Sequence, residues 1–370
     1  MIEIKKVLKK EIPNILNDDS IWKHEFLSST KHRLYAHYKN PDTSDDDIVM
    51  LLAYLDNELV GYMGVYINKI TLNNEEHKIG WLSTWWVHPK TKGTGIGKEI
   101  LNTMYQINNG KIGISAFTVS AKRVYDKSNY FVTLKVLNGV KAVLRSNLKV
   151  IIPLLLPKLQ KLKPLLRLFD GFINIFIGTK LFFQKFNIKR KLAKIDLEYT
   201  NIIDDETKEV INKFNENNLS YKHHAFFEWL KAYQWVQEAP VIENTLKRRY
   251  EFSMCDKSYN IYLIKVLSAN VCIGFIVLQR RNSVIKVLFA YYDKVKYSWI
   301  ISNIIILQAI NQKVCEIICY DEAICVEIKK SYAFIYKRKK VSESIISKAF
   351  NISNFDNVVM NMGDGDSCFT

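Results

Sequence analysis

A glycine-rich loop between a strand-like segment and an amphipathic helix constrains this sequence more than any other feature. The loop runs from Lys92 to Gly97, and three of its six residues are glycine. Glycine adopts positive φ angles without strain and lets backbone N–H groups approach a ligand, while the start of a helix carries about half a positive charge. The loop therefore favours a pyrophosphate or phosphate ligand at the start of the helix.

The segments around this loop predict an ordered series of elements. Before it we expect a helix and then a three-stranded antiparallel meander, at residues 20–38, 48–55, 59–71 and 77–87. After the helix that follows the loop we expect a strand, a short helix and a strand, at residues 112–119, 120–128 and 130–136. The meander excludes the βαβ unit of a dinucleotide-binding fingerprint, and the loop lacks the spacing of a P-loop.

The second half of the chain repeats this order of elements. We expect two helices, three strands, a helix, a strand, a helix and a strand at residues 204–217, 224–236, 260–267, 271–279, 284–291, 299–312, 314–319, 321–330 and 332–336. The counterpart of the glycine loop, Asp293 to Ser298, contains no glycine. Because 370 residues exceed the usual size of a single core, we predict two α+β domains, at residues 1–137 and 196–370, joined by a basic helical connector at 138–195.

The loop and the residues before it resemble a known family motif. Val-His-Pro at residues 87–89, followed by the loop at 92–97, is similar to the acyl-CoA-binding motif of the GNAT superfamily of acyltransferases. That motif is usually Arg or Gln, two residues, Gly, one residue, and Gly or Ala. Lys92 stands at its Arg or Gln position, and Gly95 and Gly97 stand at its glycines.

A second motif of the same family follows at the expected distance. The family usually has Asn or Ser followed by Ala, and then Tyr before Gly-Phe; here these positions match Ser120, Ala121 and Tyr125, followed by Asn129 and Tyr130. Asparagine suits the position of the usual glycine, because it also accepts the left-handed conformation that ends a helix. The pairing of the two motifs is more specific than either motif alone.

The resemblance implies a fold and a coenzyme site. It implies two GNAT-like domains, each with a mixed, mostly antiparallel central sheet flanked by helices, with the coenzyme motif retained only in the first. Acetyl-CoA would be the cosubstrate, held by strand backbone along the pantetheine arm and by the loop amides at the pyrophosphate. The residues implied for coenzyme binding are Trp86, Val87, Lys92, Gly93, Thr94, Gly95, Ile96, Gly97, Ser120 and Tyr125.

The catalytic groups are only half identified. By resemblance, Tyr125 lies near the thioester sulfur and protonates the leaving thiolate as a general acid. No general base stands out, because the strand at residues 81–87 contains no acid and the acids and histidine at residues 75–77 precede it in a turn. The deprotonation route stays open.

The function that the resemblance implies is transfer of an acetyl group from acetyl-CoA to a primary amine. Gly363 to Ser367 resembles the ending of two-domain GNAT-like proteins of bacterial surface-polysaccharide biosynthesis, which favours an amino sugar as the acceptor. Two alternatives stay open: a tandem GNAT-like aminoacyl transferase acting on cell-wall precursors, and a non-catalytic CoA-binding scaffold. No metal site is expected, since the acidic pair in the C-terminal segment is too small for a calcium loop.

The net charge of +16 is concentrated in one part of the chain. Residues 135–194 contain fourteen Lys or Arg residues against one acid, Asp170, which gives +13. Many leucines alternate with these basic residues, so one helical face should be strongly apolar. Three interpretations stay open for 138–194: peripheral contact with a membrane or lipid-linked substrate, a site for a phosphorylated or nucleotide-linked substrate, and a connector that packs against its own domains. Nucleic acid is disfavoured, because leucine stands where base-stacking aromatics are expected.

Two further features bear on the location of the protein. The first fourteen residues mix charged and apolar side chains and lack the apolar core of a signal peptide, so we expect a cytoplasmic protein, with membrane association left open by the basic segment. All six cysteines lie in the second half without the spacing of a zinc site, and we expect buried, reduced thiols.

Overall fold

The computed structural model describes residues 2–73, 75–238, 250–352 and 355–369. The strands of the first half are β1 (Ile2–Leu8), β2 (Ile48–Leu55), β3 (Glu58–Leu72), β4 (Glu75–Val87), β5 (Ile112–Ile114) and β6 (Phe131–Val143). Those of the second half are β7 (Ile195–Thr200), β8 (Gln237–Glu238), β9 (Cys255–Asp256), β10 (Tyr259–Ser268), β11 (Val271–Arg281), β12 (Val284–Tyr292), β13 (Glu316–Cys319) and β14 (Tyr336–Ser347).

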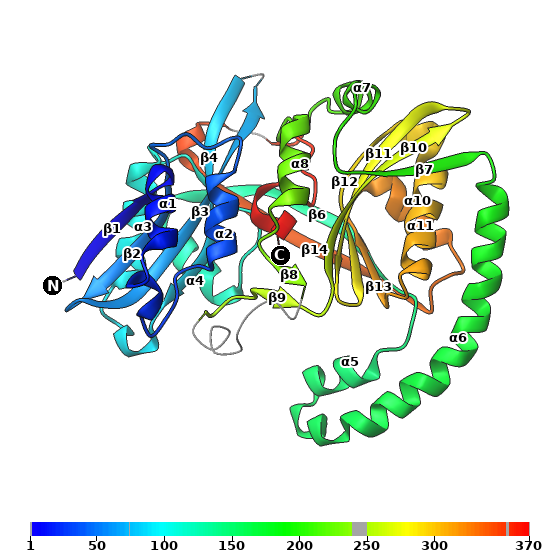
Figure 1. Ribbon diagram of the computed structural model, residues 1–370, viewed down its shortest axis with the longest axis horizontal. Helices are drawn as coiled ribbons and strands as arrows, with labels where there is room; N and C mark the ends of the chain where they lie inside the picture. The colour runs from blue at the N-terminus through cyan, green and yellow to red at the C-terminus, as the bar shows by residue number, and fades with distance from the viewer. Residues whose placement is uncertain (1, 74, 239–249, 353–354, 370) are drawn as a thin grey trace.

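Twelve of these strands form one continuous sheet across the molecule (Figure 1). Their order is β1-β2-β3-β4-β5-β14-β6-β13-β12-β11-β10-β7, and β8 and β9 form a separate pair. Most neighbours are antiparallel, with β4–β5 and β12–β13 as the parallel pairs within the large sheet. The expected α+β architecture, with a mixed, mostly antiparallel sheet flanked by helices, is confirmed.

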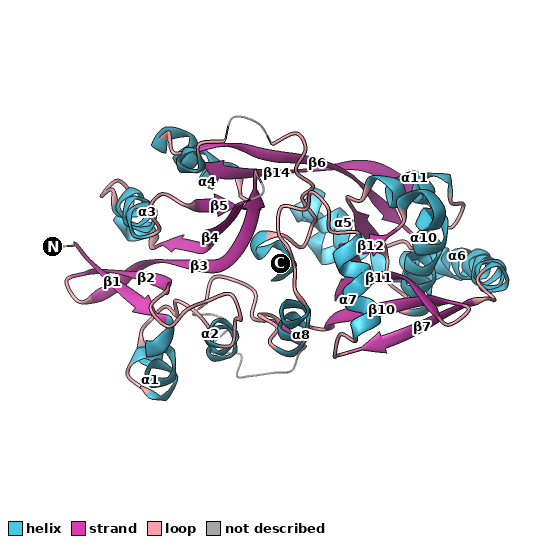
Figure 2. Cartoon of the chain, turned by 90° about the horizontal axis from the view of Figure 1, so that it is seen from above, coloured by secondary structure: helices cyan, strands magenta, loops and turns pink. Residues whose placement is uncertain are grey.

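Helices cover both faces of this sheet. Those of the first half and the connector are α1 (Ile12–Asn17), α2 (Lys31–Tyr38), α3 (Ile96–Ile107), α4 (Val119–Ser128), α5 (Leu148–Leu155) and α6 (Lys163–Lys191). Those of the second half are α7 (Asp205–Lys213), α8 (His224–Ala232), α10 (Lys294–Asn311) and α11 (Glu322–Lys330). Figure 2 shows α3 and α4 on one face of the first half and α1, α2 and α8 on the other.

The long strand β14 joins the two halves. It lies between β5 and β6, pairing with β5 at Ile345 and Ile346 and with β6 from end to end. β6 also pairs with β13 of the second half. A buried cluster follows the same arrangement, since Tyr66 and Trp81 of the first half share it with Phe289 of the second. The last strand of the chain therefore completes the sheet of the first half.

The predicted helix at residues 20–38 is wrong in its extent. A short 3₁₀ turn lies at Ile21–Lys23, and α2 begins at Lys31. The Thr30 hydroxyl accepts a hydrogen bond from the N–H of Arg33, so Thr30 is the cap that starts the helix. The helical pattern of the sequence loosens after Ser28, just before this true start.

The connector differs from the short helical pieces that its prolines suggest. α6 is a continuous helix of 29 residues, because Pro164 lies in its first turn, where a missing N–H costs no hydrogen bond. Pro153 lies inside α5, and Pro157 begins a 3₁₀ segment at Pro157–Leu162. None of the helices that the structure describes has the length and apolar character needed to cross a membrane.

Several strand boundaries were not predicted. β1 is an edge strand whose charged residues alternate with apolar ones, and no strand was predicted there. β6 is longer than predicted because it pairs with β14 beyond its expected end. The strand predicted at 332–336 is wrong in its position, since β14 begins at Tyr336 and runs to Ser347 along β6. β5 is shorter, since its pairing stops at Ile114. These lengths depend on partners distant in the sequence.

Candidate active site

The parallel strands β4 and β5 separate part-way along their length. They pair only at Gly80 with Ile112 and at Trp81 with Gly113, whereas β4 continues to Val87. Beyond these pairs, the edge of β4 that faces β5 has no strand partner among the described residues. Backbone N–H and C=O groups on such an edge need another partner, and an extended ligand could provide one.

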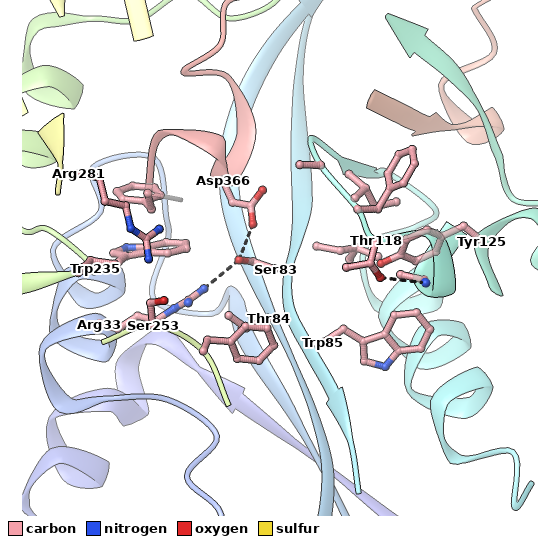
Figure 3. Close-up of a pocket in the computed structure, with 18 residues that line it drawn as sticks. Arg33, Ser83, Thr84, Trp85, Thr118, Tyr125, Trp235, Ser253, Arg281 and Asp366 are labelled. Carbon is pink, nitrogen blue, oxygen red and sulfur yellow. Dashed lines mark hydrogen bonds between the residues drawn. The ribbon is translucent and has the colours of Figure 1, made fainter. Parts of the chain in front are cut away.

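A cavity of about 430 Å³ lies at this opening, and Figure 3 shows its lining. A bulge in β4 shapes the opening: the register between β3 and β4 shifts next to Thr84, whose φ is 51°. The lining combines apolar and aromatic side chains with three charged ones. They are Arg33, Leu82, Ser83, Thr84, Trp85, Ile114, Ala116, Phe117, Thr118, Ala121, Tyr125, Trp235, Val236, Phe252, Ser253, Arg281, Asp366 and Phe369.

A buried carboxylate bridges the two diverging strands. Asp366, in the C-terminal 3₁₀ helix Gly365–Phe369, accepts a hydrogen bond of 2.7 Å from the Ser83 hydroxyl on β4. Its other oxygen accepts a hydrogen bond from Ser115, the residue after β5. Burial raises the pKa of Asp366, and the two serine hydrogen bonds oppose this shift. The site therefore contains a carboxylate that is a stronger base than an exposed aspartate.

Arg33 supports this carboxylate from the other side. Its guanidinium donates to the Ser83 hydroxyl at 2.9 Å and to the Tyr250 hydroxyl at 3.2 Å. It stacks on the Trp235 ring at 3.8 Å, and that ring stacks in turn on Phe369 at 3.9 Å. The stack holds the cation where it lowers the cost of burying the negative charge of Asp366.

Tyr125 lines the opposite wall of the same cavity (Figure 3). It lies on α4 and is 4% exposed. Burial raises its pKa, and the nearby charge of Asp366 adds to the effect, so the phenol keeps its proton. Its ring packs 5.5 Å from that of Trp85. α4 ends at Asn129, whose φ of 57° confirms the left-handed conformation expected there.

The glycine loop lies next to the end of β4. Gly93 and Gly95 have φ angles of 89° and 84°, and a Cβ atom on either would meet no atom within 4 Å. α3 begins directly after Gly95, and its first three N–H groups have no backbone acceptor within the described ranges. A Cβ on Gly97 would lie 3.3 Å from Trp85 and 3.6 Å from Val87. An anion bound at the helix start would therefore adjoin the opening between the strands.

Residues 11–129 match the sequence model of the acetyltransferase (GNAT) family. This part of the chain is similar to a GNAT acetyltransferase domain. No curated protein shows significant sequence similarity to the chain.

Solved structures with a similar fold include several acyltransferases. One is the N-myristoyltransferase of Saccharomyces cerevisiae with bound myristoyl-CoA, which is 7% identical, covers 93% of this chain and 82% of its own, and has a TM-score of 0.51. Another is a GCN5-related N-acetyltransferase from Anabaena variabilis, 7% identical over 94% of this chain and 72% of its own, with a TM-score of 0.49. At this identity the similarity concerns the fold, and the expected GNAT-like fold is confirmed.

Of the predicted coenzyme residues, Tyr125 lines the cavity and the glycine loop lies next to the end of β4, but two of the others point elsewhere. The Trp86 ring packs against Tyr62 at 5.2 Å and does not line the described cavity, so only its backbone remains for a ligand there. Ser120 is exposed in the first turn of α4, where its hydroxyl lies 2.9 Å from that of Thr118. Lys92 and Thr94 are exposed beside the start of α3.

The carboxylate that sequence reasoning did not find near β4 comes from the end of the chain. Asp366 lies in the segment Gly363 to Ser367, which attracts notice in the sequence for its acids and glycines but without any link to β4. The sequence gives Ser83 no role, because serine is not an acid. Sequence spacing gives no signal for Arg33, because its helix reaches the site only through the folding of the sheet.

The second half has a similar opening, and the C-terminal segment of the protein occupies part of it. β12 and β13 pair only over residues 284–286 and 316–318. Gly363 of the C-terminal segment passes so close that a Cβ would lie 2.1 Å from the Phe289 ring. At the start of α10, the Asp293 carboxylate accepts hydrogen bonds of 3.0 Å from the N–H groups of Val295 and Lys296. An internal carboxylate thus occupies the position that an anion would take in the first half.

Proposed function

We propose that the chain is an N-acyltransferase that moves an acetyl group from acetyl-CoA to a primary amine. The observation that carries this proposal is the position of Asp366 and Tyr125 on facing walls of one cavity, at the opening between β4 and β5. The match of residues 11–129 to the acetyltransferase (GNAT) family supports acyl transfer as the activity. The carboxylate and the phenol supply the base and the acid that such a transfer needs.

Asp366 accepts a proton from the ammonium form of the acceptor, which frees the nitrogen lone pair to attack the thioester carbonyl. Tyr125 donates its proton to the thiolate as the carbon–sulfur bond breaks. The nitrogen that has attacked then gives up a second proton, which restores the phenol and leaves the amide. The products are the amide, the free thiol of coenzyme A and one proton released from Asp366. Burial suits both roles, because it raises the pKa of each group.

The coenzyme would lie along the free edge of β4, with its pyrophosphate at the glycine loop. The positive φ angles of Gly93 and Gly95 support this placement, as do the first N–H groups of α3, which have no backbone acceptor among the described residues. Asp293 at the start of α10 disfavours a second phosphate site, because its charge already uses the corresponding N–H groups. We therefore propose one coenzyme per chain.

We propose an amino sugar, of the kind used in surface polysaccharides, as the acceptor. Aromatic rings and hydrogen-bonding groups share the cavity, as a sugar ring with hydroxyl groups would require. We also propose the units 1–137 and 196–370 with a connector at 138–195; the repeated element order supports this division, although β6 continues to Val143 and β14 pairs with β5 and β6 of the first unit.

The structure weakens both alternatives, the non-catalytic scaffold and the aminoacyl transferase. A site without a carboxylate near β4 would favour a non-catalytic scaffold, but Asp366 supplies such a carboxylate. An aminoacyl transferase that uses no coenzyme A would have no need of the open glycine loop. A second candidate function therefore has no specific support.

The test is calorimetry of the full chain with acetyl-CoA, followed by a screen of amines in which free thiol is measured and products are weighed by mass spectrometry. One bound acetyl-CoA per chain and acetylation of an amino sugar support the proposal. Binding with no turnover across the screen would favour the scaffold. Binding of aminoacyl-tRNA without binding of acetyl-CoA would favour the aminoacyl transferase.

A further inference from the structure

We infer that α5 and α6 form a docking surface for an anionic lipid membrane. α5, the segment after it and the beginning of α6 lie away from the sheet, and the rest of α6 runs alongside α10 (Figure 1). α6 has one face that packs on the protein, formed by Leu166, Ile177, Leu181 and Ile188. These residues recur at helical spacing; Ile177, Leu181 and Ile188 belong to the core, and Leu166 is also buried.

The opposite face of α6 is apolar and exposed. Leu168, Phe172, Phe176, Phe183 and Phe186 also recur at helical spacing, and each is between 63% and 71% exposed. A helix rises about 1.5 Å per residue, so this stripe is roughly 27 Å long. Soluble surfaces rarely expose a contiguous apolar stripe of this size unless a partner covers it.

The tip of the connector also has exposed apolar side chains. Leu154, Leu155 and Leu156, at the end of α5, are between 55% and 76% exposed. The 3₁₀ segment that follows carries Lys158 and Lys161. Leucines and lysines thus meet where the connector lies farthest from the sheet (Figure 1).

Basic side chains flank the apolar stripe. By helical periodicity, Lys185 and Lys189 lie along one side of it, and Lys180 and Lys191 lie along the other. This is the pattern of a helix that lies in the plane of a membrane, with apolar side chains in the acyl region and cations at the headgroups.

The positive net charge of the connector indicates an anionic partner. Residues 148–194 contain eleven Lys or Arg residues and one acid, Asp170, which gives +10. Asp170 is buried and accepts hydrogen bonds from the Ser146 hydroxyl and from the N–H groups of Leu148 and Lys149, so it caps α5 and does not face solvent. Two copies of this surface would repel each other, whereas an anionic bilayer attracts both the charge and the apolar face.

The test is co-sedimentation of the full chain with vesicles of phosphatidylcholine alone and with equal parts of phosphatidylglycerol. We expect binding to the anionic vesicles, weaker binding to the neutral ones, and a loss of this preference in high salt. The variant F172S/F176S/F183S should bind the anionic vesicles at least about tenfold more weakly. K185E/K189E should lose the preference for phosphatidylglycerol.

The matched control is V295S/Y332S, which removes two apolar side chains that are 93% and 82% exposed elsewhere. It should bind as the wild type does, and circular dichroism should show that every variant is folded. Failure of the wild type to bind either vesicle, or binding of the triple variant equal to the wild type, would overturn the inference. So would a wild-type dimer in sedimentation velocity that the triple variant converts to a monomer, because a second copy would then cover the stripe.

Discussion

The hydroxyl of Ser83 donates a hydrogen bond of 2.7 Å to the carboxylate of Asp366, a residue 283 positions later in the chain. Ser83 lies on β4, within the segment that matches the GNAT family, and Asp366 lies in the last helical turn that the structure describes. The proposed base therefore does not belong to the segment that matches the family. A catalytic site of this kind forms only when the C-terminal segment has returned to β4.

Replacing Asp366 with asparagine should remove the base and leave the fold intact. We expect kcat to fall by about 10²- to 10⁴-fold, with little change in acetyl-CoA binding. Because burial raises the pKa of Asp366, wild-type activity should rise with pH as this carboxyl loses its proton, and the variant should lack that rise. Initial rates across pH and calorimetry with acetyl-CoA measure both effects.

The stability of the same variant provides a second readout. A carboxyl whose pKa is raised by folding contributes stability below its unfolded pKa, and that contribution disappears as pH rises through the folded pKa. At neutral pH the asparagine variant should therefore be at least as stable as the wild type in thermal unfolding. Asp126→Asn, on exposed α4 surface, is the control and should keep full activity. Unfolding of Asp366→Asn at neutral pH would instead assign Asp366 a structural role.

Replacing Tyr125 with phenylalanine should affect the chemical step alone. The phenol keeps its proton because burial and Asp366 both raise its pKa, so the variant loses a proton donor without losing a charge. We expect kcat to fall by about 10²-fold or more and KM for acetyl-CoA to stay close to the wild-type value. Steady-state kinetics with a poorer thiol leaving group should show a larger effect. An unchanged kcat would mean that Tyr125 only packs against Trp85.

The sequence predicts the glycine loop, Tyr125 and the order of elements, because each depends on neighbours within one short segment. Gly93 and Gly95 adopt the positive φ angles that the loop pattern favours, and Asn129 ends α4 in the left-handed conformation. Local chemistry is enough to recognise such features.

The rest of the site depends on long-range pairing that no local pattern records. Asp366 reaches Ser83 only because β14 inserts between β5 and β6 and the chain then turns back to β4. The length of α6 follows from the position of Pro164 in its first turn, where proline starts a helix and does not break one. A proline in such a segment can therefore indicate the start of a helix as well as a break.

Replacing Gly95 with alanine should weaken acetyl-CoA binding. Gly95 has a φ of 84°, and left-handed backbone costs a residue with a Cβ about 1–2 kcal/mol. The loop would relax in the free protein and regain this strain on binding, so the Kd should rise roughly 5- to 30-fold, as calorimetry would show. Gly178→Ala in α6, where a Cβ meets no atom within 4 Å, is the matched control. Equal Kd values for the two variants would contradict the placement of the pyrophosphate.

The buried pair of Lys222 and Asp364 should hold the C-terminal segment in place. Lys222 is 1% exposed, and its Nζ donates to Asn68 at 2.7 Å and lies 3.9 Å from Asp364 Oδ1. Burial lowers the pKa of Lys222 and raises that of Asp364. Lys222→Met leaves an uncompensated buried carboxyl, so we expect a loss of about 3–5 kcal/mol at neutral pH in urea unfolding.

The pH dependence and a double variant separate this electrostatic cost from simple loss of packing. As pH falls, Asp364 takes up a proton in Lys222→Met, so the stability difference from the wild type should shrink. Lys222→Met/Asp364→Asn should recover most of the lost stability at neutral pH, because it removes both charges together. Lys208→Met, which breaks an exposed pair with Asp205, should change little. Asp366 lies two residues after Asp364, so activity should fall in Lys222→Met and return in the double variant. If the double variant is as unstable as Lys222→Met, packing and not charge holds this segment against the sheet.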